Sequence, residues 1–183
     1  MGGKAKRVSG ERVFEGQLLA VDVDQVIEPE TDSPARREVV RHQGAAAVVP
    51  CLPGAKIILV RQYRYPPDTY LWEIPAGILE PGEKPEECAE RELREETGYN
   101  LGLLKPLAWL HSSPGFSDEV IHLFRADNIK PGTARPDPEE RLEVKAFDLL
   151  EAVDMISEGR ITDSKTIAGI LLVARNIATA SGI

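Results

Sequence analysis

Cysteine, basic residues and long apolar runs are all scarce in this chain. It has two cysteines, Cys51 and Cys88, and their spacing is not that of metal ligands. Buried reduced thiols are therefore a better interpretation than a zinc site or a disulfide. No apolar run reaches the ~18 residues of a membrane span. The first ten residues lack the apolar region of a signal peptide, so we expect a disordered leader at 1–10 and a cytoplasmic protein.

The charge balance is acidic. Lysine and arginine number 22 against 30 aspartates and glutamates, which gives a formal net charge of −8. This balance argues against a general nucleic-acid or membrane-surface binder. Hydrophobic content of 42% and charged content of 28% are ordinary for a globular protein. The length favours one domain that is large enough for a real core.

Much of the negative charge lies in one segment, residues 77–99. It contains eight glutamates and three basic residues, a local charge of −5. Glu92, Glu95 and Glu96 stand at i, i+3 and i+4, so they share one face if the segment is helical. Like charges at this spacing cost a helix roughly 0.2–0.5 kcal/mol per pair. A bound hard cation such as Mg²⁺, which prefers oxygen ligands, would reverse that cost.

Local signals predict that this segment is a helix. Pro85 suits the first helical turn, and Gly98 suits a left-handed residue at the carboxyl end. Ala89 and Leu93 form an apolar stripe that can pack inward. Upstream, residues 71–74 followed by a proline and a glycine predict a strand that ends in a loop. The segment is therefore predicted as strand, loop and helix, with carboxylates projecting from the helix.

The rest of the chain shows a mixed α/β pattern. Further strands are predicted at 14–27, 37–42, 44–49, 56–64, 106–111, 119–124 and 142–147. Pro53-Gly54 predicts a hairpin between two of them. Two helices follow, one that begins at Asp148 and stops at Gly159, and one that begins at Thr162 or Asp163.

The acidic segment resembles the Nudix box, G-x5-E-x7-R-E-U-x-E-E-x-G-U, where U is a bulky apolar residue. Every fixed place is filled, by Gly77, Glu83, Arg91, Glu92, Leu93, Glu95, Glu96 and Gly98. Tyr99 at the last place departs from the aliphatic preference. The resemblance implies an α/β/α sandwich around a mixed sheet, with an N-terminal β-strand extension. It places the extension at 11–43 and the Nudix domain at 44–183. The alternative interpretation of the acidic segment is a plain solvated acidic helix.

The resemblance also implies a chemistry. Nudix enzymes hydrolyse a nucleoside diphosphate linked to another group, with Mg²⁺, or Mn²⁺ as an alternative. Glu92 and Glu96 would be the main metal ligands, with the carbonyl of Ala76, and Glu95 would join them or act through water. By the same resemblance, Glu83 and Arg91 would be a structural pair that fixes the loop to the helix.

A catalytic base is expected in the loop after the box. By comparison with the ADP-ribose branch of the family, Glu140 is the first candidate, both as base and as a further metal ligand. Glu139 is the second candidate. A metal-activated hydroxide without a protein base is the third alternative, and then both glutamates would be ordinary loop residues.

Residues outside the box resemble the ADP-ribose pyrophosphatase branch. Pro114 lies sixteen residues after Gly98, where a proline marks that branch. The similar segments are VRQYRYP (60–66), LWEIPAG (71–77) and SPGFSDE (113–119). In that branch, the arginine matching Arg64 contacts a substrate phosphate. Ile78 would touch substrate through its backbone, and Arg37 would help to bind adenosine.

The sequence therefore predicts Mg²⁺-dependent hydrolysis of ADP-ribose to AMP and ribose 5-phosphate. Three alternatives stay open: another nucleotide sugar such as GDP-mannose, a non-catalytic nucleotide-binding regulatory module, and a role on oxidised nucleoside triphosphates. The partner is expected to be a small nucleoside diphosphate derivative, not nucleic acid or a membrane. By analogy with the branch, residues 14–41 would help to form a homodimer.

Overall fold

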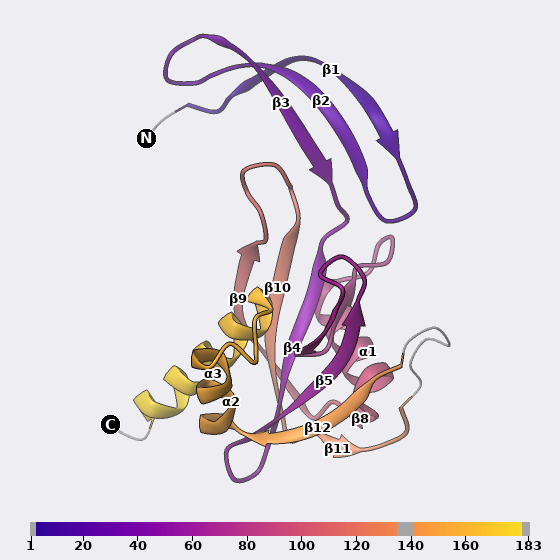
Figure 1. Ribbon diagram of the computed structural model, residues 1–183, viewed down its shortest axis with the longest axis vertical. Coiled ribbons are helices and arrows are strands. Elements are labelled where there is room, and N and C mark those ends of the chain that lie inside the picture. Colours follow the sequence, from indigo (N-terminus) through magenta and orange to yellow (C-terminus); the bar gives the residue numbers. More distant parts are fainter. Residues whose placement is uncertain (1–2, 135–140, 181–183) are drawn as a thin grey trace. The chain divides into compact units, whose positions relative to one another are not determined.

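The computed structural model describes residues 3–134 and 141–180 (Figure 1). It contains two compact units. The N-terminal unit comprises the chain up to Gly44 together with residues 111–120, and the main unit comprises residues 45–110 together with the chain from Ile121 onward. No helix in the described part of the chain is long and apolar enough to cross a membrane.

A mixed sheet forms the centre of the main unit. Its strands are β4 (Ala45–Leu52), β5 (Lys56–Arg64), β6 (Thr69–Glu73), β7 (Ala76–Ile78), β9 (Leu103–His111), β10 (Val120–Asp127) and β12 (Glu143–Asp148). The order is β12-β5-β4-β10-β9, with β6 paired to β5 and β7 paired to β4. Strand β10 runs parallel to β4, whereas β5 and β7 are antiparallel to it. A small pair, β8 (Tyr99–Asn100) with β11 (Lys130–Pro131), lies outside this sheet.

Helices cover both faces of the sheet. Helix α1 (Pro85–Thr97) lies on one face, and α2 (Leu149–Ser157) and α3 (Ser164–Ala180) lie on the other (Figure 1). Because side chains alternate along a strand, β4 serves both layers. Ala46 and Val48 pack in the core under α1. Ala47 and Val49 pack in the core under α2 and α3. The predicted α/β/α sandwich around a mixed sheet is confirmed.

The ends of α1 follow its sequence signals. Pro85 is the first helical residue, where its missing N–H costs nothing. Gly98 has φ 75° and donates its N–H to the carbonyl of Arg94 at 3.0 Å. Ala89 and Leu93 are fully buried against the sheet. Full burial of a leucine contributes about 1.5–3 kcal/mol, so this apolar stripe fixes which face of α1 turns outward.

The predicted hairpin and the two predicted C-terminal helices are present, but the caps of the two helices differ. The β4–β5 hairpin turns at Pro53-Gly54 as expected. Helix α2 begins after Asp148 and ends two residues before the left-handed Gly159. Asp148 is the N-cap residue of α2, but its side chain makes no capping hydrogen bond. Helix α3 is capped by Asp163, whose Oδ2 accepts the N–H of Thr166 at 3.0 Å.

The N-terminal unit is an antiparallel sheet, with strands β1 (Lys6–Glu15), β2 (Ala20–Ile27) and β3 (Pro34–Arg41) in that order. Strand β1 begins inside the stretch 1–10 that we expected to be disordered. Residues 6–10 pair with β2, starting with Lys6 opposite Ile27, and this pairing corrects the expected boundary of the leader.

Ion pairs take the place of an apolar core on one face of this sheet. Asp22 and Asp24 are buried, at 8% and 4% exposure. Arg12 and Arg41 bind Asp22 at 2.8 and 2.9 Å, and Arg7 and Arg41 bind Asp24 at 2.8 Å. A buried carboxylate needs such partners. Arg41, which bridges both aspartates from β3, therefore ties the third strand to the second.

We predict that this sheet is acid-sensitive. The hydrogen bonds from Arg12 and Arg41 lower the pKa of Asp22 from 3.8 to about 2. A depressed pKa gives stability that is present above about pH 4 and is lost as the pH falls toward 2. Asp22→Asn should therefore lower the urea midpoint at pH 7, and this difference from wild type should vanish near pH 2. Glu11→Gln, at an exposed position of β1, is the control; a difference for Asp22→Asn that persists at pH 2 would contradict the prediction.

Candidate active site

Strand β7 and helix α1 are both anchored on β4. In β7, Ala76, Gly77 and Ile78 pair with the first three residues of β4. The apolar side of α1 packs on the same strand. The loop between β7 and α1 must therefore lie beside the helix, which brings Glu83 next to the outward carboxylates.

Those carboxylates form the acidic face of α1, defined by Glu92, Glu95 and Glu96. Glu92 and Glu96 are buried, with 9% and 5% exposure, and Glu95 is half-buried. Acidic residues are rarely buried unless they are paired. The hydrogen bond that Arg64 of β5 donates to Glu73 raises the pKa of Arg64, and the charge of Glu96 adds to that rise. The acidic face and Arg64 thus belong to one electrostatic neighbourhood.

Arg91 holds the acidic face to the loop. Its Nε and Nη2 donate to the two oxygens of Glu83 at 2.9 and 3.0 Å. Its Nη1 donates to Glu92 at 2.5 Å and to Glu95 at 3.3 Å. Nη2 also donates to the carbonyl of Ile78 at 3.2 Å. The bonds from Arg91 lower the pKa of Glu83 to about 2, and the pKa of Arg91 is raised in turn.

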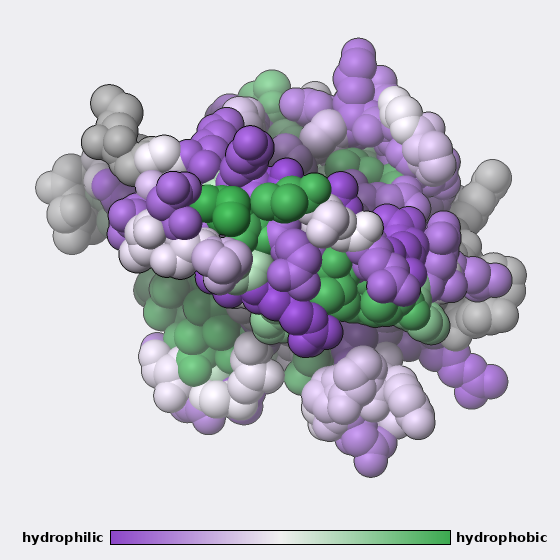
Figure 2. Space-filling view, turned by 90° about the horizontal axis from the view of Figure 1, so that it is seen from above, coloured by the Kyte–Doolittle hydropathy of each residue, from purple (hydrophilic) through white to green (hydrophobic). Residues whose placement is uncertain are grey.

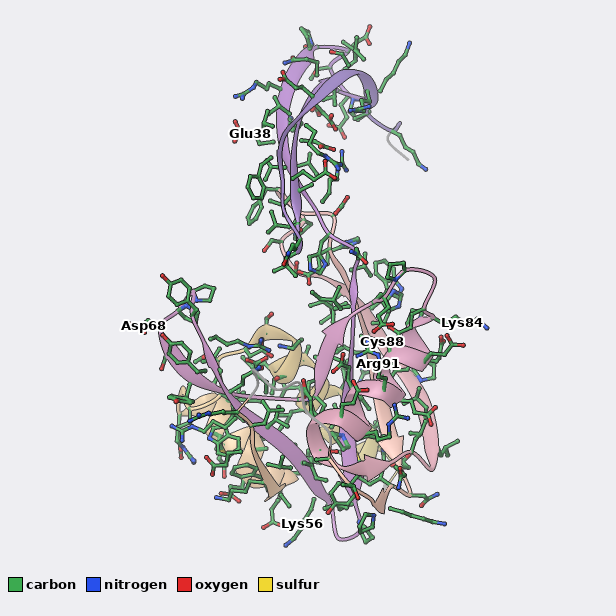
Figure 3. All side chains as sticks on the ribbon, turned by 90° about the vertical axis from the view of Figure 1, so that its right-hand side faces the viewer. Glu38, Lys56, Asp68, Lys84, Cys88 and Arg91 are labelled. Atoms are coloured by element: carbon green, nitrogen blue, oxygen red, sulfur yellow. The ribbon has the colours of Figure 1, made fainter. Side chains whose placement is uncertain are left out.

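Cys88 fills the space behind Arg91. Figure 3 shows both residues on α1, and Nη2 of Arg91 lies 3.4 Å from the Cys88 sulfur. Cys88 and Cys51 are both buried, free thiols. Burial raises the pKa of Cys88 to about 12 and that of Cys51 to about 11. Neither thiol is ionised near neutral pH, so they act as packing residues, as the sequence indicated.

Gly77 leaves the space that the Glu92 carboxylate fills. A Cβ built at Gly77 would lie 1.7 Å from Oε1 of Glu92, so any side chain there would displace the carboxylate. The acidic face offers oxygen donors, the type that Mg²⁺ and Mn²⁺ prefer. The donor chemistry fits such a cation, and the missing side chain at Gly77 lets the Glu92 carboxylate take its place in that donor set. Among residues 3–134 and 141–180, no three acidic, histidine or cysteine side chains are already grouped as a metal site.

Arg64 lies at the end of β5 and is held by Glu73 at the end of β6. Nε and Nη2 of Arg64 donate to the two oxygens of Glu73 at 2.7 and 2.9 Å. The Glu73 side chain is 3% exposed, whereas that of Arg64 is 38% exposed. A buried carboxylate thus fixes a half-exposed guanidinium, which leaves part of the cation open to solvent.

The other predicted site residues are placed as follows. The carbonyl of Ile78 is occupied by Arg91. Arg37 lies in β3 of the N-terminal unit and binds Glu28 at 2.6 Å. Pro114 lies in the same unit, in the loop before β10. Glu139 and Glu140 lie outside the described residues, so their predicted roles stay predictions.

A second charged cluster, which local sequence patterns did not predict, is formed by Glu73, Lys165 and Asp163. Lys165 of α3 lies 2.5 Å from Glu73 and 3.0 Å from Asp163. One signal was available: Glu73 is an acidic residue between Trp72 and Ile74, in an otherwise apolar strand end. Its partner lies 92 residues away, which no local pattern could reveal.

The chain belongs to the Nudix family, because the family model for the NUDIX domain matches residues 40–169. This match confirms the family that the acidic segment predicted. The chain is therefore a Nudix hydrolase, and the matched range contains the acidic segment 77–99 with the buried glutamates of α1.

Curated relatives extend the similarity over most of the chain. The ADP-ribose pyrophosphatase of Bacillus subtilis (strain 168) is 37% identical over 163 residues, 88% of each chain. The methanol dehydrogenase activator of Bacillus methanolicus is 41% identical over 167 residues, 90% of each chain. A GDP-mannose pyrophosphatase of Yersinia enterocolitica is 38% identical over 141 residues, 72% of this chain and 73% of that one. The predicted resemblance to ADP-ribose pyrophosphatases is confirmed.

A solved structure supports the fold. An ADP compounds hydrolase aligns with a TM-score of 0.83 and covers 100% of this chain and 98% of its own. At 23% sequence identity, this likeness speaks for the fold alone. It agrees with the three-layer arrangement of the main unit.

We predict that Gly77→Ala lowers activity without unfolding the protein. The new methyl group must expel the Glu92 carboxylate from its place, whereas the backbone of Gly77 has no positive φ that alanine would strain. Because misplaced catalytic groups cost about 100-fold in rate, kcat should fall by that order. Gly3→Ala, whose methyl would meet Pro29 at 3.6 Å, is the control. Full activity of Gly77→Ala in a hydrolysis assay would contradict the prediction.

Proposed function

We propose that this Nudix hydrolase cleaves the pyrophosphate bond of ADP-ribose, with Mg²⁺, to give AMP and ribose 5-phosphate. The observation that carries the proposal is the buried acidic face of α1, in a main unit that also presents the half-exposed guanidinium of Arg64. Carboxylates there can hold a divalent cation, and a guanidinium can hold phosphate oxygens. The similarity to the Bacillus subtilis ADP-ribose pyrophosphatase supports the choice of substrate.

Glu92 and Glu96 would hold Mg²⁺, together with the Ala76 carbonyl and Glu95. When bound, the metal neutralises charge on the pyrophosphate and lowers the pKa of a water molecule. The water oxygen bonds to one phosphorus, and the bond from that phosphorus to the bridging oxygen breaks. Glu83 would act by holding Arg91, and so by fixing the distance between loop and helix.

We assign the role of base to Glu140, which would take the proton of the attacking water and also ligate metal. Glu139 is the second candidate. General-base catalysis contributes about 10²–10⁴-fold. Glu140→Gln should therefore lower kcat by at least 100-fold, and Glu139→Gln should not. Equal and small effects of both variants would favour hydrolysis without a protein base.

Substrate contacts are proposed for four further positions. Arg64 would bind a phosphate of ADP-ribose through its fork of donors. Ile78 would contact substrate through its backbone. Arg37, by the resemblance, would contact the adenosine, and Pro114 is the fourth proposed contact.

We also propose a homodimer formed through the N-terminal unit. All ten residues of β1 are exposed. Large apolar side chains at the surface of this unit include Val8, Val13, Phe14 and Leu18, which are at least half exposed. Figure 2 shows such hydrophobic surface among hydrophilic side chains. Exposed apolar surface of this kind marks interaction sites. Sedimentation at the 20.1 kDa of a monomer would contradict the dimer.

Two other functions are favoured by particular relatives. The GDP-mannose pyrophosphatase favours a different nucleotide sugar at the same site. The methanol dehydrogenase activator favours a role in which the protein acts on or through another protein. The intact box and the buried acidic face support catalysis in either case.

We predict a preference for ADP-ribose in a hydrolysis panel with Mg²⁺. The panel contains ADP-ribose, GDP-mannose, ADP-glucose, NADH, a diadenosine polyphosphate and a nucleoside triphosphate. The highest kcat/KM should be that of ADP-ribose, with AMP and ribose 5-phosphate as products identified by chromatography. Removal of Mg²⁺ by a chelator should stop turnover, because the acidic face then lacks its cation.

Glu96→Gln provides the matched test of the metal assignment. It removes a charge and keeps the shape, so the fold should survive while turnover is lost. In the hydrolysis panel, a higher kcat/KM for another compound would contradict the choice of ADP-ribose as substrate but not the proposed chemistry of the site. Turnover by Glu96→Gln at the wild-type rate would overturn the metal assignment itself.

A further inference from the structure

Glu73 is a buried anion held by two cations. Arg64 donates two N–H bonds to it, and Nζ of Lys165 lies 2.5 Å from its Oε2. Burial raises the pKa of Glu73, but the hydrogen bond from Arg64 and the charge of Lys165 outweigh it, so the pKa lies below its ordinary value. A buried charge that loses one partner is strongly destabilised. Glu73 therefore depends on both cations.

The beginning of α3 fixes Lys165 in place. The Lys165 side chain is 13% exposed and also contacts Asp163 at 3.0 Å. Asp163 accepts two hydrogen bonds from Thr166, from its N–H at 3.0 Å and from its hydroxyl at 2.6 Å. The hydroxyl oxygen of Thr166 accepts the N–H of Ile74 at 2.9 Å. The contacts thus close a ring from Glu73 through α3 back to the next residue of the chain.

Arg64 is the second cation bound to Glu73, and it lies outside this ring of contacts. Its Nε and Nη2 are used by Glu73, while Nη1 makes no hydrogen bond to any other residue within 3–134 and 141–180. Because a guanidinium is planar, two bonds to one carboxylate fix the direction of its remaining donors. The orientation of Glu73 therefore sets the orientation of Arg64.

We propose that Lys165 is a positioning residue for substrate binding: it holds Oε2 of Glu73, and Glu73 in turn orients Arg64 toward a phosphate oxygen of a nucleoside diphosphate. This inference rests on the proposed function, in which Arg64 binds that phosphate. Without Lys165, the Glu73 carboxylate turns more freely and Arg64 samples more directions. The loss then falls on substrate binding, which Arg64 serves in the ground state and the transition state alike.

The test is a double-mutant cycle of Lys165→Met and Arg64→Met, with KM and kcat measured for ADP-ribose at saturating Mg²⁺. Each single variant should raise KM by about tenfold, the size expected when one charge-assisted hydrogen bond is weakened. In each, kcat should change far less than KM. Because Lys165 acts through Arg64, the double variant should show the KM of Arg64→Met alone. If the double variant does not melt cooperatively, Lys165→Gln combined with Arg64→Met keeps a donor at Glu73 and replaces it in the cycle. Calorimetry of AMP binding without metal should show the same pattern in Kd.

Lys56→Met is the matched control. Lys56 lies at the β4–β5 turn with its side chain pointing outward (Figure 3), and its ion pair with Asp148 is long, at 4.0 Å. Its KM should equal that of wild type. If Lys165→Met does not fold, Lys165→Gln keeps a hydrogen-bond donor at Glu73 and should give the same pattern with a smaller rise in KM.

The outcomes separate this inference from the proposed function. If wild type does not turn over ADP-ribose, or if Arg64→Met leaves KM unchanged, the proposed role of Arg64 fails and the inference fails with it. If Arg64→Met behaves as expected but Lys165→Met leaves KM unchanged, the inference alone is overturned. It is also overturned if the KM effects of the two single variants multiply in the double variant.

Discussion

The guanidinium of Arg91 binds the carboxylates of Glu83, Glu92 and Glu95 and the backbone carbonyl of Ile78. The rest of the site depends on these bonds. Glu92, Glu95 and Glu96 stand at a spacing where like charges destabilise a helix by roughly 0.2–0.5 kcal/mol per pair. Arg91 offsets this repulsion from within the same helix, and its bonds to Glu83 and to the Ile78 carbonyl tie the helix to the preceding loop. A single cation therefore both reduces the repulsion within the acidic face and fixes the geometry of that face.

The second charged cluster uses the same physical device with the signs exchanged. In the first, the cation Arg91 binds several anions. In the second, the anion Glu73 binds Lys165, and it also binds Arg64, which lies beside the cluster. In our proposal, the first cluster holds a metal ion, and the second orients Arg64 toward a phosphate. Both lie on the main unit, whose sheet supplies β5, β6 and β7 as rigid supports. Rigid supports matter because small displacements of such groups are costly to catalysis.

Local signals predicted much of the main unit and failed where contacts are distant. Helix α1 was predicted well because Pro85, Gly98 and the apolar pair Ala89 and Leu93 are all signals within the segment itself. The ring through Lys165 was missed because its partners lie 92 residues apart and meet only through the sheet. Strand β1 was predicted to begin too late, because its ten exposed residues carry no pattern of burial. Its pairing with β2 comes from a neighbouring strand and not from its own composition.

The central claim is that Arg91 organises the acidic face for a metal ion, and Mn²⁺ binding tests it most directly. Coulomb's law alone predicts tighter binding of a cation when a nearby positive charge is removed. Calorimetry should compare Arg91→Met with Arg94→Met, which removes the same charge from the same helix but only a long contact, 3.6 Å, to Glu95. Provided both variants melt cooperatively, our account predicts weaker Mn²⁺ binding for Arg91→Met and unchanged or tighter binding for Arg94→Met. Tighter binding by both would contradict it, because Arg91 would then act only as an opposing charge.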